Sequence, residues 1–188
     1  MAKHSNLKDD FMIIKQPELK DDVVYLKALN PSNTEALFLM FSDKELCRKS
    51  GLTPQTHISQ TYTFILDNQK KVKSRVYYYW GIFVEETLVG VVSLLGLDYI
   101  KQTGELGYFI GSDYTRNGYM SKTLKLVVNF ALSKTKIKAI NAYVETNNQA
   151  SIKLVEKLGF EKIGESIEED MSDNFVPMYQ YEISELIK

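Results

Sequence analysis

A polar loop between a predicted strand and a predicted helix has the residues of this chain that are best suited to bind an anion. The strand ends near Ile110 and the helix begins around Met120. The first backbone N–H groups of a helix have no partner within it, and with the positive end of the helix dipole they favour a phosphate. Gly118 allows the backbone to turn sharply and to approach a ligand closely. A single glycine here also occurs in ordinary turns, and neither the Walker A pattern nor G-x-G-x-x-G is present.

Two motifs around this loop resemble those of a known family. The residues TRNGYM at 115–120 are similar to motif A of the GCN5-related N-acetyltransferases (GNAT), Gln/Arg-x-x-Gly-x-Gly/Ala, although Thr115 and Met120 depart from it. The residues NQASIKLVEKLGF at 148–160 closely resemble motif B, and they follow a predicted strand, as in the family. The resemblance covers about residues 76–183. A methionine at the last position of motif A, here Met120, resembles the branch that contains the ribosomal-protein N-terminal acetyltransferases.

The resemblance implies that the chain binds acetyl-CoA as its co-substrate. In the family, the amides of the motif A loop bind the pyrophosphate of coenzyme A, and the pantetheine arm pairs with the open backbone of the preceding strand. Asn148 is expected near the pantetheine, although it also suits a helix N-cap. The other expected coenzyme contacts are Phe109 and Ile110 on the strand, and Thr115, Arg116, Asn117, Gly118, Tyr119, Met120 and Ser121 in the loop.

Acetyl transfer requires a base for the amine proton and assistance to the departing thiolate. Glu105 is the candidate base, because it starts the strand on which several family members carry a catalytic glutamate. An ordered water would be the alternative base, and Glu105 would then be a surface or structural residue. Many family members use a tyrosine of the motif B helix to protonate the thiolate, but Val155 occupies that position here. The resemblance assigns this role to Ser151, which equally suits the start of a helix.

Two tyrosines flank the loop, Tyr108 before it and Tyr119 within it. One is expected to pack in the core and the other to line the ligand groove. The sequence leaves open which tyrosine does which.

Hydrophobic periodicity predicts the elements that hold these residues. Strands are expected at 23–29, 76–84, 87–95, 105–110, 138–144, 160–167 and 178–183, with a tight turn at Glu85 and Glu86. Helices are expected through about Met40, at 59–66, from about Met120, and over motif B as far as Gly159. The basic residues at 70–75 are expected in a solvated loop. This order predicts an α/β (α+β) fold, with a single mixed, mostly antiparallel sheet of six to seven strands and about four helices. The resemblance adds a parallel splayed pair in the middle, formed by 105–110 and 138–144.

Length and composition predict one domain of ordinary globular type. The chain has 188 residues, of which 44% are hydrophobic and 25% charged, so a single sizeable core can form. Residues 21–188 are expected to form a single GNAT domain, preceded by a flexible N-terminal segment at 1–20.

Several classes of function are excluded at this stage. The 23 Lys and Arg residues nearly balance 24 Asp and Glu residues, so no basic field favours nucleic acid. Cys47 is the only cysteine, which excludes an internal disulfide and a Cys-based metal cluster; no metal is expected. No apolar stretch reaches the roughly 20 residues of a membrane-spanning helix, and the N-terminus lacks a secretory core. The sequence therefore predicts a cytoplasmic protein.

Three classes of function remain open. The first is an active N-acetyltransferase, whose acceptor is a protein N-terminus or a small-molecule amine that attacks the thioester directly. The second is a non-catalytic acyl-CoA-binding module, and the third is an interaction protein that has kept only the fold. A homodimer is compatible with each class. The acidic residues near the C-terminus would either attract a cationic amine or form a solvated hairpin: Glu165, Glu168, Glu169, Asp170 and Asp173.

Overall fold

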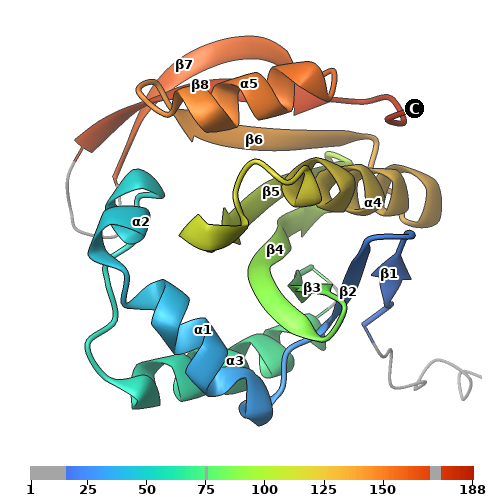
Figure 1. Ribbon diagram of the computed structural model, residues 1–188. Coiled ribbons are helices and arrows are strands. Elements are labelled where there is room, and N and C mark those ends of the chain that lie inside the picture. The colour runs from blue at the N-terminus through green and yellow to red at the C-terminus, as the bar shows by residue number, and fades with distance from the viewer. Residues whose placement is uncertain (1–15, 75, 170–174) are drawn as a thin grey trace, which may run out of the picture.

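The computed structural model of the protein describes residues 16–74, 76–169 and 175–188, which form one open sheet with helices on both faces (Figure 1). The strands are β1 (Leu19–Lys20), β2 (Val24–Ala28), β3 (Tyr78–Val84), β4 (Thr87–Asp98), β5 (Thr103–Ile110), β6 (Ala139–Glu145), β7 (Glu161–Glu169) and β8 (Phe175–Ile183). The α-helices are α1 (Thr34–Phe41), α2 (Lys44–Lys49), α3 (Ile58–Val72), α4 (Tyr119–Lys134) and α5 (Gln149–Lys157). Short 3₁₀ helices, η1 (Pro31–Asn33) and η2 (Ser112–Tyr114), precede α1 and α4. Within these residues, no helix has both the length and the apolar character needed to cross a membrane.

The sheet confirms the predicted fold class. Its strand order is β1-β2-β3-β4-β5-β6-β8-β7, and among the described strands only β5 and β6 pair in parallel. The described strands number eight, because the two-residue β1 adds to the seven that were predicted. The described α-helices number five, because α2 was not foreseen. This helix begins after Asp43, whose carboxylate caps it. It has only six residues, so its hydrophobic pattern is too short to detect.

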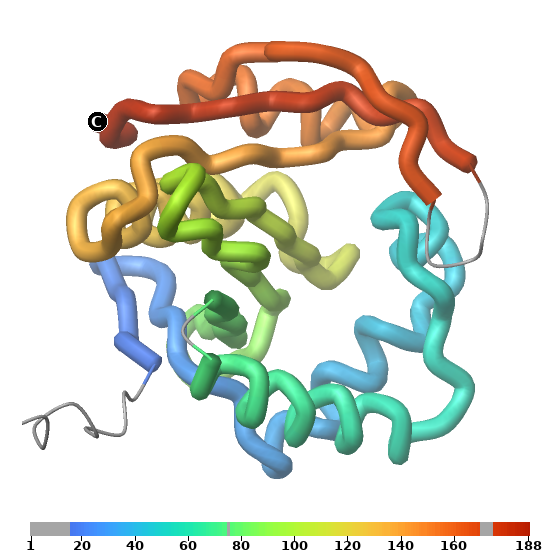
Figure 2. Tube along the Cα trace, turned by 180° about the vertical axis from the view of Figure 1, so that it is seen from behind, coloured from blue at the N-terminus to red at the C-terminus, as the bar shows by residue number. Residues whose placement is uncertain are grey.

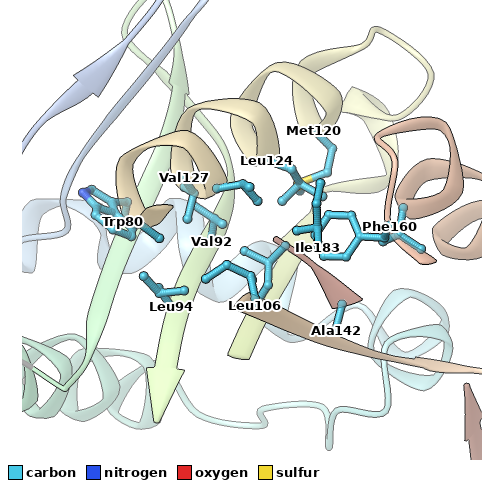
Figure 3. Close-up of a cluster of buried hydrophobic side chains, with 14 of the residues drawn as sticks. Trp80, Val92, Leu94, Leu106, Met120, Leu124, Val127, Ala142, Phe160 and Ile183 are labelled. Atoms are coloured by element: carbon cyan, nitrogen blue, oxygen red, sulfur yellow. The ribbon is translucent and has the colours of Figure 1, made fainter. Parts of the chain in front are cut away.

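Helices lie on opposite faces of the sheet (Figures 1 and 2). A hydrophobic cluster attaches the helices of each face to the strands. The larger cluster lies under α4 and α5, where Met120, Leu124 and Val127 of α4 point toward Val92 and Leu106 of the sheet (Figure 3). The smaller cluster packs α1 and α3 on the other face. On β4 the adjacent residues Leu88 and Val89 lie in opposite clusters, and so do Val91 and Val92, so this strand is buried on both faces.

The beginning of the described chain is tied to the sheet. The Gln16 side chain donates to the Tyr79 carbonyl at 2.8 Å and accepts from the Tyr79 amide at 3.1 Å. The Trp80 indole donates to the Pro17 carbonyl at 2.7 Å, and β1 pairs with β2. Residues 16–20, which the sequence analysis assigned to the flexible segment 1–20, are therefore part of the folded domain. Residues 1–15 lie outside the described chain.

Helix α3 is longer than the predicted helix at 59–66. It continues to Val72, so Lys70 and Lys71 lie in its last turn and not in a loop. Positive charges in the last turn interact favourably with the helix dipole, and Lys70 also pairs with Asp67 at 3.1 Å. Arg75, the last residue of the predicted basic loop, is not described.

The parallel strands β5 and β6 separate partway along their length. They pair only between residues 103–105 and 139–141, although β5 continues to Ile110 and β6 to Glu145. Strand β5 keeps its pairing with β4, and β6 keeps its pairing with β8. The sheet is therefore split at the carboxyl ends of its parallel pair, which is where open α/β sheets generally bind ligands.

Candidate active site

A cleft of about 470 Å³ lies at this split in the sheet. Four of the predicted site residues line it, namely Glu105 and Phe109 on β5, and Asn148 and Ser151 at the start of α5. The motif A loop and Ile110 are not among the lining residues of this cleft. They follow at the end of β5, where the chain enters α4 (Figure 1). The site thus has two parts: a cleft through the sheet, and a loop at the N-terminus of a long helix.

The loop presents an uncapped helix N-terminus. Gly118 is the N-cap residue of α4, has a left-handed φ of 78°, and makes no side-chain cap. The first helical hydrogen bond joins the Lys122 amide to the Gly118 carbonyl at 3.2 Å. A side chain at Gly118 would meet no other atom within 4 Å, so the space beside this backbone is open. By contrast, side chains of Asp43 and Asn148 cap α2 and α5. These features fit a phosphate group of acetyl-CoA.

The polar side chains of the loop stabilise its own conformation. The Thr115 hydroxyl donates to the Ser112 carbonyl at 3.0 Å, and the Asn117 amide donates to the Thr115 carbonyl at 3.2 Å. Arg116 is exposed and has a left-handed φ of 64°, which few residues other than glycine adopt. Left-handed residues of this kind occur in the backbone turns whose successive N–H groups form anion-binding nests.

The first turn of α4 packs against the core. Met120 is buried under the sheet cluster, Tyr119 is half-buried against the same cluster, and Ser121 is half-buried. Tyr108 also touches this cluster, but it lines the cleft, and Tyr119 does not. Of the two tyrosines that flank the loop, Tyr108 is therefore the one that lines the cleft.

At the end of β5, the main chain on the side of the split is not paired with another described strand. Beyond Glu105, its backbone has no pairing with β6. The Phe109 side chain is buried on the α1 side of the sheet, with its ring centroid 5.3 Å from that of Phe41. The part of Phe109 that is open to the split is therefore its backbone, and its contact with the coenzyme stays a prediction.

Glu105 lies at the last paired position of β5, directly before the split. Its carboxylate is open to the cleft, yet burial by the surrounding protein raises its pKa, and the nearby Glu168 carboxylate raises it further. The same two carboxylates also contribute to a raised pKa of the Tyr143 phenol, after burial. A carboxylate with a raised pKa is a stronger base, which suits proton removal from an amine.

The start of α5 forms the other side of the split. The Asn148 side chain accepts from the Ser151 amide at 3.1 Å and donates to the Lys49 carbonyl at 3.2 Å. Asn148 is therefore the N-cap of α5 and also connects it to the end of α2. Ser151 is half-buried in the cleft, whereas Val155 is completely buried in the core and cannot reach a ligand.

The lining of the cleft is acidic. Glu105, Glu145, Glu168 and Glu169 supply four carboxylates, and Lys49 is the one cation among the described lining residues. Part of the acidic stretch predicted to border the acceptor groove thus lines the cleft. Glu165 instead pairs with Lys162 at 2.8 Å on the surface, and Asp170 and Asp173 lie outside the described chain.

The lining also includes residues that the sequence did not identify as site residues. Glu145, Tyr77 and Tyr79 line the cleft, together with the segment from Lys49 to Leu52 that ends α2. The run of aromatic residues at 77–80 was interpreted only as a strand, because both of its faces are apolar. Alternation along the extended segment 77–80 separates Tyr77 and Tyr79 from Tyr78 and Trp80, but it does not indicate which face a cleft will occupy.

Comparison with known proteins gives consistent matches. A family model described as an acetyltransferase (GNAT) domain matches residues 24–161. A Bacillus subtilis (strain 168) relative, "Uncharacterized N-acetyltransferase YoaA", is 31% identical over 150 residues, covering 79% of this chain and 85% of that protein.

Solved structures share the fold at low sequence identity. An acetyltransferase from Salmonella typhimurium that modifies the N-terminal serine of ribosomal protein L7/L12 has a TM-score of 0.80 at 18% identity, over 88% of this chain and 96% of its own. A Vibrio cholerae spermidine N-acetyltransferase, in complex with CoA and spermine, has a TM-score of 0.74 at 16% identity, over 87% and 96%.

Proposed function

The chain belongs to the GNAT acetyltransferase family, and from this premise we propose that it transfers the acetyl group of acetyl-CoA to a primary amine. One observation carries the proposal: an uncapped, glycine-led helix N-terminus follows directly on a strand whose backbone opens onto an acidic cleft. The first feature suits the phosphates of the coenzyme, and the second suits its extended arm and a cationic acceptor.

The chain would hold acetyl-CoA mainly through its backbone. The N–H groups from Arg116 to Ser121 would bind the pyrophosphate, with Gly118 leaving room for its approach. The main chain of Phe109 and Ile110 would pair with the pantetheine arm, and Asn148 lies on the facing wall. The coenzyme supplies an activated acetyl thioester; a strand N–H directed into the split would polarise its carbonyl oxygen.

The proposed proton chemistry uses residues of the cleft. Glu105 accepts the proton that the amine must lose, because its raised pKa makes it a stronger base than an ordinary glutamate. Ser151, on the opposite wall, assists the departure of the thiolate. An ordered water in place of Glu105 is the alternative base, and the glutamine variant considered in the Discussion distinguishes the two.

The acceptor is proposed to be a cationic primary amine. Four carboxylates in the cleft lower the energy of a positive charge there, and Tyr77, Tyr79 and Tyr143 add aromatic surface that favours cations. Both a protein N-terminus and a polyamine satisfy this chemistry. One structural neighbour modifies an N-terminal serine, and another is in complex with spermine. A cytoplasmic location fits the free thiol of Cys47, because the cytoplasm keeps thiols reduced. A homodimer stays a prediction.

Acetyl-CoA at about 100 times its dissociation constant is expected to stabilise the fold by ~2.7 kcal/mol, because it binds only the native state. Thermal melts with and without the coenzyme measure this shift. Release of free thiol is then followed with N-terminal peptides and polyamines as acceptors. Stabilisation without thiol release for any amine would favour the acyl-CoA-binding module. A melt that does not move in millimolar acetyl-CoA would overturn the functional claim.

A further inference from the structure

The thiolate that leaves the thioester needs a proton donor of suitable acidity. An ordinary alkyl thiol has a pKa of about 8.5, and a phenol of about 10, so proton transfer between them is nearly balanced. A serine hydroxyl is a much weaker acid and is poorly matched to this task. Ser151 therefore leaves the source of the proton unexplained.

Tyr108 places a phenol at the required location. It lies on β5, three residues beyond Glu105, and lines the same cleft. Residues an odd number apart on a strand point to opposite faces, so Glu105 and Tyr108 meet the split from opposite sides. Three residues of strand separate them by roughly 10 Å along β5.

The hydroxyl of Tyr108 has no structural use in the described chain. Its oxygen is buried and has no hydrogen-bond partner there. Burial raises the pKa of this phenol, and the Ser151 side chain opposes the rise. The two hydroxyls are thus neighbours without the geometry of a full hydrogen bond. A buried hydroxyl without a partner costs stability, which is understandable if a ligand completes its bonding.

We propose that Tyr108 is the catalytic acid that protonates the leaving sulfur, and that Ser151 stabilises the phenolate formed. The assignment rests on the proposed acetyl transfer. A cationic amine first releases one proton to solvent; as the neutral amine nitrogen then forms its bond to the acetyl carbon, Glu105 takes one N–H proton. As the C–S bond breaks, its electron pair goes to sulfur, which takes the proton of Tyr108. The proton on Glu105 returns to the phenolate through solvent, so the enzyme is restored and itself gains or loses no proton.

Tyr108→Phe tests this role, because it removes only the hydroxyl oxygen. The expected result is a fall in kcat of roughly 10²-fold or more, with little change in KM for either substrate. Thermal stability should stay the same or rise, since a buried group without a partner is lost. Tyr181→Phe is the matched control: Tyr181 is buried outside the cleft and donates to Glu156 at 3.0 Å, so this variant should lose stability and keep its kcat.

A binding measurement gives a second readout that does not depend on turnover. Calorimetry compares CoA with desulfo-CoA, which lacks only the sulfur. The native protein should prefer CoA, and Tyr108→Phe should lose that preference while binding desulfo-CoA as before. Native kcat in Tyr108→Phe, or an equal loss of affinity for both probes, would overturn the assignment. Absence of thiol release by the native protein would instead overturn the proposed function.

Discussion

Glu105→Gln is expected to lower kcat/KM for the acceptor amine by roughly 10²–10⁴-fold, the range that a positioned general base contributes. Glutamine keeps the shape of the side chain but cannot accept the amine proton. Affinity for acetyl-CoA should stay nearly intact, because Glu105 lies before the split and the motif A loop lies beyond β5. Steady-state kinetics and coenzyme titration measure the two effects separately.

The pH profile should change in a specific way. In the native protein, kcat/KM should fall as the pH drops through the raised pKa of Glu105, because the base becomes protonated. This acidic limb should disappear in Glu105→Gln. Raising the pH should partly rescue the variant, since more of the acceptor amine is then already neutral. Full activity in Glu105→Gln would assign the base role to an ordered water.

The same substitution should increase stability near neutral pH. The pKa of Glu105 is higher in the folded than in the unfolded chain, so ionisation costs the folded state more. This cost is absent below the unfolded pKa and is complete above the folded pKa. Glu105→Gln removes it, so the melting temperature should rise at pH 7 and change less at pH 4. A fall in melting temperature at pH 7 would contradict the origin assigned to the pKa shift.

Gly118→Val is expected to weaken acetyl-CoA binding by at least about tenfold, which is more than the loss expected for Thr115→Ala in the same loop. A residue with a Cβ pays about 1–2 kcal/mol in the left-handed region, and a branched side chain projects over the N–H groups that face the ligand. No atom of the protein lies within 4 Å of the added Cβ, so the loss should appear in binding more than in packing. Isothermal titration with CoA measures it.

Two variants control for this prediction. Thr115→Ala removes one hydrogen bond, to the Ser112 carbonyl, and should cost less than about fivefold in affinity. Gly118→Asn keeps a residue that tolerates the left-handed conformation, so it should bind better than the valine variant. Equal affinities for Gly118→Val and Thr115→Ala would be incompatible with a phosphate site built from the backbone.

Features that depend on a few neighbouring residues could be predicted from the sequence. Helix α5 ends before Gly159, whose φ is 90°, and the β3–β4 turn falls at Glu85, whose φ is 54°. The loop before α4, with Gly118 as the N-cap of that helix, is also a feature of a few neighbouring residues. Each of these depends on local backbone conformation or on the local pattern of apolar residues, so the information is contained within one short segment.

The walls of the cleft depend on contacts between distant segments, and only the tertiary structure decided them. Asn148 meets the Lys49 carbonyl 99 residues away, which brings α2 against α5. Strand alternation assigns Tyr108 and Glu105 to opposite faces, and the family resemblance predicted the splayed pair, but only the structure shows that pairing stops at Glu105 so that both residues reach one cleft. The position of the split depends on which strands pair and where that pairing stops. The strands and the helices that pack on them come from distant parts of the chain, so no single stretch of sequence contains this information.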